Sequence, residues 1–520
     1  MKVEKMNLGE TGNFSPLFLD YLQEKDALKS FYDLFPVPEN FEKQIKAKDF
    51  SKDKRRVLTA VLREQYEGLE ADNKVLDNIS LLDDEKTFTI TTGHQLNIFT
   101  GPLYFIYKIA TVINTCKKLA ETFPQFNFVP VYWMASEDHD FEEINHFRLF
   151  GKKYEWTTDQ SGAVGRFNPG ELGELLASLP EKVALFERAY LEHKTLANAT
   201  RCYVNELFGA GGLVVIDADH KKLKAEFSEL LLDDMKNQSA EAIVGSNSSQ
   251  IEKLGYKSQV FCRPVNCFYL QDNVRERIIL QDDRYLINNT DLSFSREEMF
   301  DLLKTNPEKF SPNVILRPLY QESILPNLAY IGGPAEVAYW LQLHDLFKHY
   351  KLSFPILMPR NFALVVNRGN IKKIRKSGMQ VKDLFKDEKS LKDQFIAKNA
   401  EFKLSLEQEK EILSQVIQSI KNQALAVDKS LEGFTGAEGK KMLKIAEGIE
   451  KRLKKAEETK HDESLQSLVK TKERLFPEGK LQERTDNFLN FYLNNPGFIQ
   501  ETLNAFDPFD FRFHILIEDE

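Results

Sequence analysis

Residues 91–102 read TTGHQLNIFTGP, and residues 131–146 read VYWMASEDHDFEEINH. Each stretch begins as an apolar, strand-like run and ends in Gly, His, Gln, Asn, Glu and Asp side chains. Strands that end in this way are typical of parallel sheets in open α/β folds, whose sites lie at the carboxyl ends of the strands. A strongly helical sequence, 103–123, separates the two strands. This part of the chain therefore predicts a β-α-β unit with a right-handed crossover.

The overall composition indicates a globular protein of several domains. The chain has 520 residues, of which 42% are hydrophobic and 29% charged, so roughly three to four domain-sized units are expected. A net charge of −9 gives the chain no overall positive potential that would attract nucleic acid. Four cysteines make no disulfide framework, and neither a secretory signal nor a membrane span is visible. We therefore expect a cytoplasmic protein that binds neither nucleic acid nor membrane.

Further apolar runs extend the predicted sheet. GLVVIDAD (212–219) is a buried strand that ends in two aspartates, residues 329–333 end in Gly-Gly, and 354–366 is a last apolar strand region. From these we expect a core in 1–150, an inserted connecting segment in 151–210, the rest of the core in 211–385 with a second insertion near 240–310, a helical arm in 386–480, and a segment, 481–520, that docks on the core.

The arm has the periodicity of a coiled coil. Apolar residues step by four and three from Leu413 to Leu431 and again from Met442 to Ala456, with a break near GFTG (433–436). A glycine-containing break between two such seams predicts an antiparallel helical hairpin. The hairpin has one narrow apolar stripe, which favours a coiled coil. The alternative is an amphipathic helix pair that packs on its own domain.

The first group of candidate site residues follows the first strand. Glycines allow a ligand to approach the backbone closely, and Pro102 opens a helix whose N–H groups suit an anion. His94 could donate to a phosphate or carboxylate oxygen. The alternative is a tight turn with a satisfied loop histidine. The candidate binding residues are Gly93, His94, Gln95, Asn97, Thr100 and Gly101.

The second group follows the second strand. Asp138, His139 and Asp140 are candidates for a general base, and Asn145 and His146 for substrate binding. If 139–146 were helical, His139, Glu142, Glu143 and His146 would share a face that could bind a divalent metal. The usual zinc signatures are absent, so no metal is predicted. An acidic helix start that only compensates the helix dipole is the remaining alternative.

The third group has the same arrangement as the first, glycines followed by a helix that begins with proline. Gly332 and Gly333 precede a helix that Pro334 opens, with Glu336 in its first turn and Tyr339 one turn later. Two such helix N-termini in one crevice would bind two anionic groups, although Glu336 could simply compensate the dipole. Further binding candidates are Arg317 and Arg360, which could clamp a carboxylate or pair structurally, and Lys373 and Lys376 of a basic segment that is otherwise a solvated face.

At TTGHQLNIFTGPLYFIYKIATVI and VPVYWMASEDHDFEEINHF the sequence resembles the BshC family, the cysteine ligases of bacillithiol biosynthesis. The resemblance continues through IDADH, LRPLYQESILPNLAYIGGPAEVAYWLQL and LFPEGKLQERTDNFL, in the same order and over nearly the whole chain. The family pattern Gly-Gln-Gln is Gly93-His94-Gln95 here. This departure favours Gln95 and the backbone as the groups that carry a role.

The resemblance implies a Rossmann-like core with inserted connecting segments and a coiled-coil arm that supports a homodimer. It also implies the reaction, in which L-cysteine is joined to the amino group of glucosaminyl-malate. A free carboxylate resists attack by an amine, so we expect activation by ATP. The 93–102 turn would then hold phosphate or carboxylate, one of residues 138–140 would accept the amine proton, and Glu336 with the 332–334 backbone would hold the second substrate.

Two other functions stay open from the residues. One is a metal-dependent hydrolase built on His139, Glu143 and His146. The other is a non-catalytic coiled-coil scaffold whose Rossmann-like domain senses a nucleotide. The enzyme hypotheses depend on one geometric prediction, that the His94 turn, the acidic stretch after Ser136 and the double-glycine turn before Glu336 line a single cavity.

Overall fold

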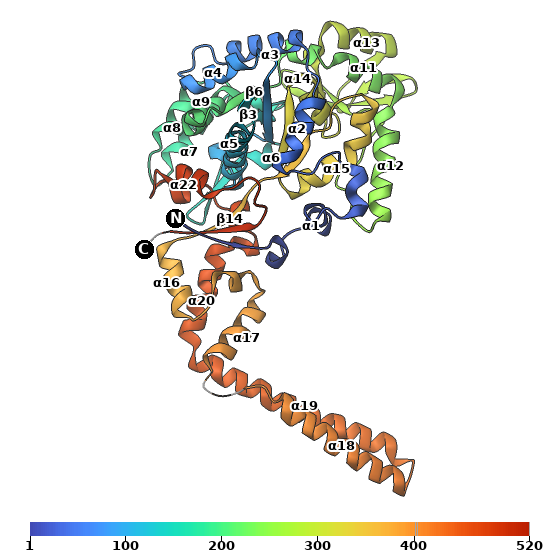
Figure 1. Ribbon diagram of the computed structural model, residues 1–520, viewed down its shortest axis with the longest axis vertical. Helices are drawn as coiled ribbons and strands as arrows, with labels where there is room; N and C mark the ends of the chain where they lie inside the picture. Colours follow the sequence, from blue (N-terminus) through green and yellow to red (C-terminus); the bar gives the residue numbers. More distant parts are fainter. Residues whose placement is uncertain (401, 403, 519–520) are drawn as a thin grey trace.

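The computed structural model describes residues 1–400, 402 and 404–518, so the last two residues of the expected C-terminal segment lie outside it. A central sheet of five parallel strands is the core of the molecule (Figure 1). Helix α5 (Tyr104–Thr122) connects two of its strands, as the sequence predicted. The strand order is β13 (Ile356–Pro359), β12 (Asn327–Gly332), β2 (Thr87–His94), β3 (Asn127–Met134) and β6 (Val214–Asp217).

The order of the strands reverses between β2 and β12. From β2 the chain continues outward to β3 and β6, and it then returns to the other side of β2 to form β12 and β13. In such a sheet the ligand crevice lies at the carboxyl ends of the strands where the order reverses. The junction is held inside the sheet by Asn327, whose Oδ1 accepts hydrogen bonds from the hydroxyls of Thr89 and Thr91.

Two insertions interrupt the sheet. The first, between β3 and β6, is mainly helical, and the second, between β6 and β12, holds an antiparallel sheet in the order β10-β9-β8-β7-β11. The first contains α6 (Phe141–Ile144), β4 (His146–Leu149), β5 (Lys152–Glu155), α7 (Gly173–Ala177), α8 (Ala184–Glu192) and α9 (Leu196–Phe208). The second contains α10 (Lys221–Ala225), α11 (Ser228–Asn237), α12 (Ser239–Lys253), β7 (Cys267–Gln271), β8 (Val274–Gln281), β9 (Arg284–Ile287), β10 (Ser293–Ser295), α13 (Arg296–Thr305), β11 (Phe310–Pro312) and α14 (Arg317–Ile324).

Helices at the start of the chain and after β12 complete the core. Four helices precede β2, and two of them, α1 and α2, begin with proline. The helix that Pro334 was predicted to open is present. These elements are α1 (Pro16–Leu22), α2 (Pro38–Ala47), α3 (Lys52–Gln65), α4 (Asn73–Leu81) and α15 (Pro334–His349).

The apolar run 354–366, predicted as a strand region, forms two strands that belong to different sheets. Pro359 ends β13, and it has no N–H with which to extend the sheet. The chain then turns at Arg360 and Asn361, whose backbone N–H groups bond the Gly332 carbonyl and the Thr111 hydroxyl. The second strand, β14 (Phe362–Val366), joins a separate sheet in the order β1-β15-β14, with β1 (Lys2–Met6) and β15 (Phe513–Ile517).

The arm leaves the core after β14 and projects away from it (Figure 1). The predicted antiparallel hairpin is formed by α18 (Glu407–Val427) and α19 (Leu431–Lys460). Its break lies at residues 428–430, where the Asp428 carboxylate accepts the Ser430 N–H, and not at the glycines of 433–436. Those glycines lie inside α19, because a glycine costs a helix only about 1 kcal/mol. The remaining helices are α16 (Arg368–Lys376), α17 (Glu388–Asn399), α20 (Asp462–Leu475), α21 (Leu489–Tyr492) and α22 (Phe498–Ala505).

Two further findings concern the whole described chain. All four cysteines are free thiols. Among the described residues, none of the helices has both the length and the apolar character that a membrane crossing requires.

Candidate active site

A cavity of about 380 Å³ opens at the carboxyl ends of β2 and β12, where the strand order reverses. The first turns of α5 and α15 both contribute to its wall, so two helix N-termini with partial positive charge meet there. Of the three places predicted to line one cavity, the His94 turn and the double-glycine turn meet there, but no residue of the acidic stretch after Ser136 lines it, so that part of the prediction was wrong. The lining residues are Gly93, His94, Gln95, Tyr104, Lys108, Trp133, Ala135, Val314, Arg317, Tyr330, Gly333, Pro334, Ala335, Glu336, Tyr339, Arg360 and Arg484.

Gly93 allows two side chains to pack directly on the backbone of β2. A Cβ at this position would lie 3.0 Å from the Tyr330 hydroxyl and 3.7 Å from Nη1 of Arg317. Gly332 serves α15 in the same way, since its Cβ would lie 3.0 Å from Cβ of Glu336. The glycines at the two strand ends thus bring Tyr330, Arg317 and Glu336 close to the cavity.

Glu336 is fully engaged by its neighbours. Its Oε1 accepts a hydrogen bond from Tyr330 at 2.7 Å, and its Oε2 accepts one from the Gly333 N–H at 2.8 Å. Oε2 also lies 2.6 Å from the ammonium of Lys108. Burial opposes ionisation, but Lys108 and these hydrogen bonds outweigh it and lower the pKa of Glu336. Glu336 is therefore an ionised partner of Lys108 and a weak base.

Lys108 was not among the predicted site residues. It is the one basic residue in the apolar run LYFIYKIATVI, and that isolation is the signal that could have identified it. It is buried, and it also donates to the Gly93 carbonyl oxygen at 2.8 Å. Burial is the main cause that lowers the pKa of Lys108, against the attraction of Glu336. Lys108 thus ties α5 to both glycine turns.

Arg317 presents a half-buried positive charge to the cavity. Its guanidinium donates to Gln321 at 3.1 Å and to the Tyr339 hydroxyl at 3.2 Å. It also lies over the ring of Tyr330, with 5.5 Å between the guanidinium carbon and the ring centroid. Within the described chain Arg317 has no carboxylate partner at ion-pair distance. A guanidinium held in this way suits a carboxylate or phosphate of a ligand.

Arg360 lines the same cavity, but it is paired structurally. Its Nη2 lies 2.5 Å from Oε1 of Glu483, and the two side chains are only 2% and 1% exposed. Glu483 also accepts the Ala363 N–H at 3.0 Å, so the pair holds the returning C-terminal segment against β14. Of the two sequence alternatives for Arg360, a carboxylate clamp or a structural pair, the geometry favours the second.

His94 is a neutral wall residue. Burial, followed by the charges of Lys108 and Arg360, lowers its pKa well below the ordinary range. Its Nε2 is enclosed and has no hydrogen-bond partner among the described residues. The ring packs edge-on against Tyr104, with centroids 5.4 Å apart. His94 is therefore uncharged and contributes no positive charge to the cavity.

The acidic stretch after Ser136 does not line the cavity, but two of its carboxylates contact Gln95, which does. Nε2 of Gln95 donates to Oδ2 of Asp138 at 2.9 Å and to Oε2 of Glu143 at 2.6 Å. Burial opposes ionisation of Asp138, but hydrogen bonds from His139 and Gln95 and the charge of Arg275 hold its pKa well below the usual range. Asp140 accepts the Glu143 N–H at 3.3 Å and caps α6. The predicted base candidates Asp138 and Asp140 thus have structural partners, and neither lines the cavity.

The expected metal-binding face of 139–146 does not form. Helix α6 covers only Phe141–Ile144, and His146 already belongs to β4, where its Nδ1 pairs with the neighbouring Asn145 side chain at 3.0 Å. Throughout the described part of the chain, no three His, Cys, Asp or Glu side chains gather as metal ligands would. The helix ends early because the Asn145 carbonyl accepts the Trp156 N–H and starts the β4–β5 ribbon.

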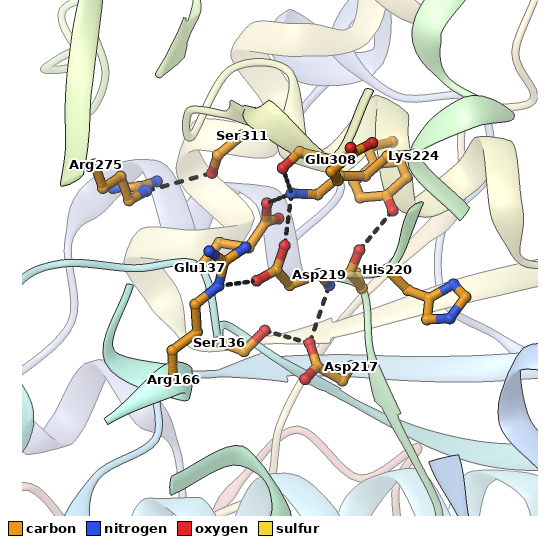
Figure 2. Close-up of polar contacts among 12 residues, drawn as sticks. Ser136, Glu137, Arg166, Asp217, Asp219, His220, Lys224, Arg275, Glu308 and Ser311 are labelled. Carbon is orange, nitrogen blue, oxygen red and sulfur yellow. Dashed lines mark hydrogen bonds and ion pairs between the residues drawn. The ribbon is translucent and has the colours of Figure 1, made fainter. Parts of the chain in front are cut away.

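A buried charge network lies beside the site at the ends of β3 and β6 (Figure 2). The ammonium of Lys224 lies 2.5 Å from Oε1 of Glu137 and 2.7 Å from Oδ1 of Asp219, whose other oxygen accepts from Arg166 at 2.9 Å. The aspartates of IDAD were recognised as a strand end, but Lys224, five residues after Asp219, was not. The network joins both insertions to the sheet.

The other candidates lie outside the cavity wall. Asn97 donates to the Glu143 carbonyl at 2.9 Å, and a Cβ at Gly101, whose φ is 60°, would overlap it. Thr100, with φ of 70°, belongs to the same turn, so these residues shape the loop that carries Gln95. Lys373 and Lys376 lie on α16 in the arm and do not line the cavity.

Comparisons with known proteins agree with this architecture. Residues 1–361 match the family model of the bacillithiol biosynthesis BshC N-terminal Rossmann-like domain, and residues 363–518 match that of the BshC C-terminal coiled-coil domain. A relative from Flavobacterium psychrophilum is 44% identical over 506 residues, 95% of each chain. Relatives from Flavobacterium johnsoniae (42%, 99% of this chain and 100% of the relative) and Bacillus cereus (27%, with the same coverage) match over their full length.

All three relatives carry the name "Putative cysteine ligase BshC". The predicted resemblance and the predicted α/β fold with a coiled-coil arm are thereby confirmed. Both family models together cover nearly the whole chain, in the order in which the core and the arm occur in the structure. This chain belongs to the BshC family of bacillithiol biosynthesis.

Proposed function

We propose that this protein joins L-cysteine to the amino group of glucosaminyl-malate, and so forms the amide bond of bacillithiol in the cavity between β2 and β12. Family membership supports the reaction. The cavity supports the substrate class, since both compounds carry carboxylates. The observation that carries the proposal is the half-buried Arg317 guanidinium in the cavity wall, free of any described carboxylate partner, beside the N-termini of α5 and α15.

Activation of the cysteine carboxylate by ATP is part of this proposal. A free carboxylate is a poor acceptor for an amine, because its negative charge repels the nucleophile and it has no good leaving group. Attack of the carboxylate on the α-phosphate of ATP would form an acyl-adenylate and release pyrophosphate. The amine would then form the amide and release AMP. Support for the nucleotide comes from this chemistry and from the Arg317 guanidinium, which suits phosphate; the N-terminus of α15 is already capped by the Glu336 carboxylate.

The test follows both products of the nucleotide. Purified protein is incubated with cysteine, glucosaminyl-malate and ATP, and bacillithiol, AMP and pyrophosphate are measured together. We expect the three to appear in equal amounts, and Arg317→Met to reduce all three at least tenfold. Arg56→Met, which removes an exposed arginine of α3, is the control. Bacillithiol without AMP would overturn the adenylation, and no bacillithiol at all would overturn the ligase function.

The hydrolase and the scaffold receive no comparable support. The helical face required for the hydrolase metal is not formed in the structure. A scaffold does not require the buried Lys108–Glu336 pair and the Arg317 guanidinium to converge on a cavity.

We propose that the protein forms a homodimer through the arm and acts in the cytoplasm. Support for the dimer is a row of apolar side chains on α18 and α19 that are exposed to solvent in the single chain. Burying this row against a second copy of the arm would remove apolar surface from water. Support for the cytoplasm is the free state of all four cysteines and the biosynthetic role of the family. The exposed apolar residues are Ile412, Val416, Ile420, Val427, Phe434, Met442, Ile445, Ile449 and Leu453.

A further inference from the structure

The orientation of the Gln95 side-chain amide is determined by two carboxylates. Its Nε2 lies 2.9 Å from Oδ2 of Asp138 and 2.6 Å from Oε2 of Glu143. Ionised carboxylates only accept hydrogen bonds, so the amide must present its NH2 group to them. The flipped amide would place its oxygen against two negatively charged oxygens. Both N–H groups of Gln95 are therefore used outside the cavity.

A residue of the second insertion, Arg275, lies beside Asp138 and keeps its carboxylate in place to accept the hydrogen bond from Gln95. Nη1 of Arg275, from β8, lies 3.6 Å from Oδ1 of Asp138 and 2.6 Å from Nδ1 of His139. Arg275 is buried, stacks on Phe268 with its guanidinium carbon 4.0 Å from the ring centroid, and donates to the Ser311 hydroxyl at 3.3 Å (Figure 2). The inserted sheet thus keeps a positive charge next to Asp138.

The cavity wall then has two chemically opposite parts. Arg317 and the helix N-termini offer positive charge and hydrogen-bond donors. Gln95 also lines the cavity, and its free amide atom is Oε1, which can only accept. The two carboxylates directly behind Gln95 add negative potential at this place, which favours a cation over an anion.

We infer that Gln95 Oε1 is a binding subsite for the amino group of a substrate, with Asp138, Glu143 and Arg275 as its positioning residues. The inference deepens the proposed ligase function and rests on it. Two amines are available, the α-amine of cysteine and the sugar amine of glucosaminyl-malate, and both share the chemistry that Gln95 recognises. The expected role of the 93–102 turn as a holder of phosphate or carboxylate is then confined to its backbone.

The experiment compares each amine with its N-acetylated form by isothermal titration calorimetry. The four ligands are L-cysteine, N-acetylcysteine, glucosaminyl-malate and N-acetylglucosaminyl-malate. The proteins are the wild type, Gln95→Met, which keeps the length of the side chain without an acceptor, and Arg275→Gln. The matched control is Arg277→Gln, an exposed arginine of the same strand.

We expect the wild type and Arg277→Gln to bind one of the two amines at least tenfold more tightly than its acetylated form, since a hydrogen bond to a charged group contributes that much. Gln95→Met should lose this preference and keep the affinity for the acetylated form, and Arg275→Gln should weaken the preference, because Asp138 is then no longer held where it orients Gln95. The amine whose preference over its acetylated form is lost in Gln95→Met is the substrate amine that Gln95 binds. An unchanged preference in Gln95→Met would overturn the subsite and leave the ligase function intact. Wild-type protein that binds neither amine would overturn both.

Discussion

The ammonium of Lys108 lies 2.6 Å from Oε2 of Glu336, and this pair joins the N-terminal parts of α5 and α15 at the cavity. The same ammonium bonds the carbonyl of Gly93 at the end of β2. One buried charge therefore connects three elements that begin or end at the site. Its loss should affect both the stability of the fold and the geometry of the cavity.

Glu336→Gln should destabilise the protein by about 2–3 kcal/mol. The change leaves Lys108 buried without a counter-ion, and the cost falls below that of a fully enclosed pair because the Glu336 side chain is 24% exposed. Urea denaturation measures the loss. The matched control is Glu298→Gln, since Glu298 occupies the same capping position in α13 but is exposed to solvent. Equal effects of the two variants would show that Lys108 does not depend on Glu336.

Arg360→Met should destabilise the protein by about 3–5 kcal/mol, because Glu483 is then left charged in a closed interior. Replacing both partners, in Arg360→Met with Glu483→Leu, should recover most of that loss, since no unpaired charge remains. Guanidinium denaturation of the two single variants and the double variant gives the coupling energy. A double variant as unstable as the sum of the single variants would contradict the pairing.

Acid should destabilise the protein through His514. Both ring nitrogens of this buried residue lack a partner among the described residues, and burial, followed by the charge of Lys5, lowers its pKa to about 4. The unfolded chain binds a proton near pH 6.5 and the folded chain only near pH 4. The stability that this histidine contributes is therefore present above pH 6.5 and is lost as the pH falls, by about 3 kcal/mol.

His514→Leu should consequently flatten the stability profile between pH 7 and pH 4. Denaturation midpoints at four pH values measure the profile, with the exposed His349→Leu as the control. If His514→Leu and the wild type lose stability in parallel, the acid sensitivity has another origin.

If the proposed homodimer forms through the arm, Ile445→Glu should convert it into a monomer. Ile445 is 64% exposed on α19, and a charge there would be buried without a partner if a second arm covers it. Sedimentation velocity measures the mass. Gln418→Glu adds the same charge to an exposed polar position of α18 and should leave the dimer intact. A dimer that survives Ile445→Glu would place the interface elsewhere.

The strong periodic signals of the sequence were sufficient for the core. The run of β2, α5 and β3 could be predicted because each is long and apolar and ends in a clear change to polar residues. The convergence of the His94 and Gly333 turns followed from the geometry of parallel sheets alone. The glycines were expected to let a ligand approach the backbone, whereas at Gly93 and Gly332 the structure shows side chains of the protein itself at close approach.

Predictions failed where a partner lies far away in the sequence. Glu483, which distinguishes the role of Arg360 from that of Arg317, is 123 residues distant. The metal-binding face considered for 139–146 is absent, because α6 ends after one turn, where the Asn145 carbonyl accepts the Trp156 N–H. The sequence around Lys108 gives no sign of a site except that the lysine stands alone in an apolar run. A buried and an exposed helical lysine look alike in the sequence until the carboxylate partner is known.

The sheet β1-β15-β14 sets a condition on biosynthesis. In the described chain β1 pairs only with β15, which occupies residues 513–517. Residues 2–6 therefore remain without their sheet partner while more than 500 further residues emerge from the ribosome. The closing of this sheet is a late event, and a chain that stops short of residue 513 leaves two strand edges open to intermolecular pairing.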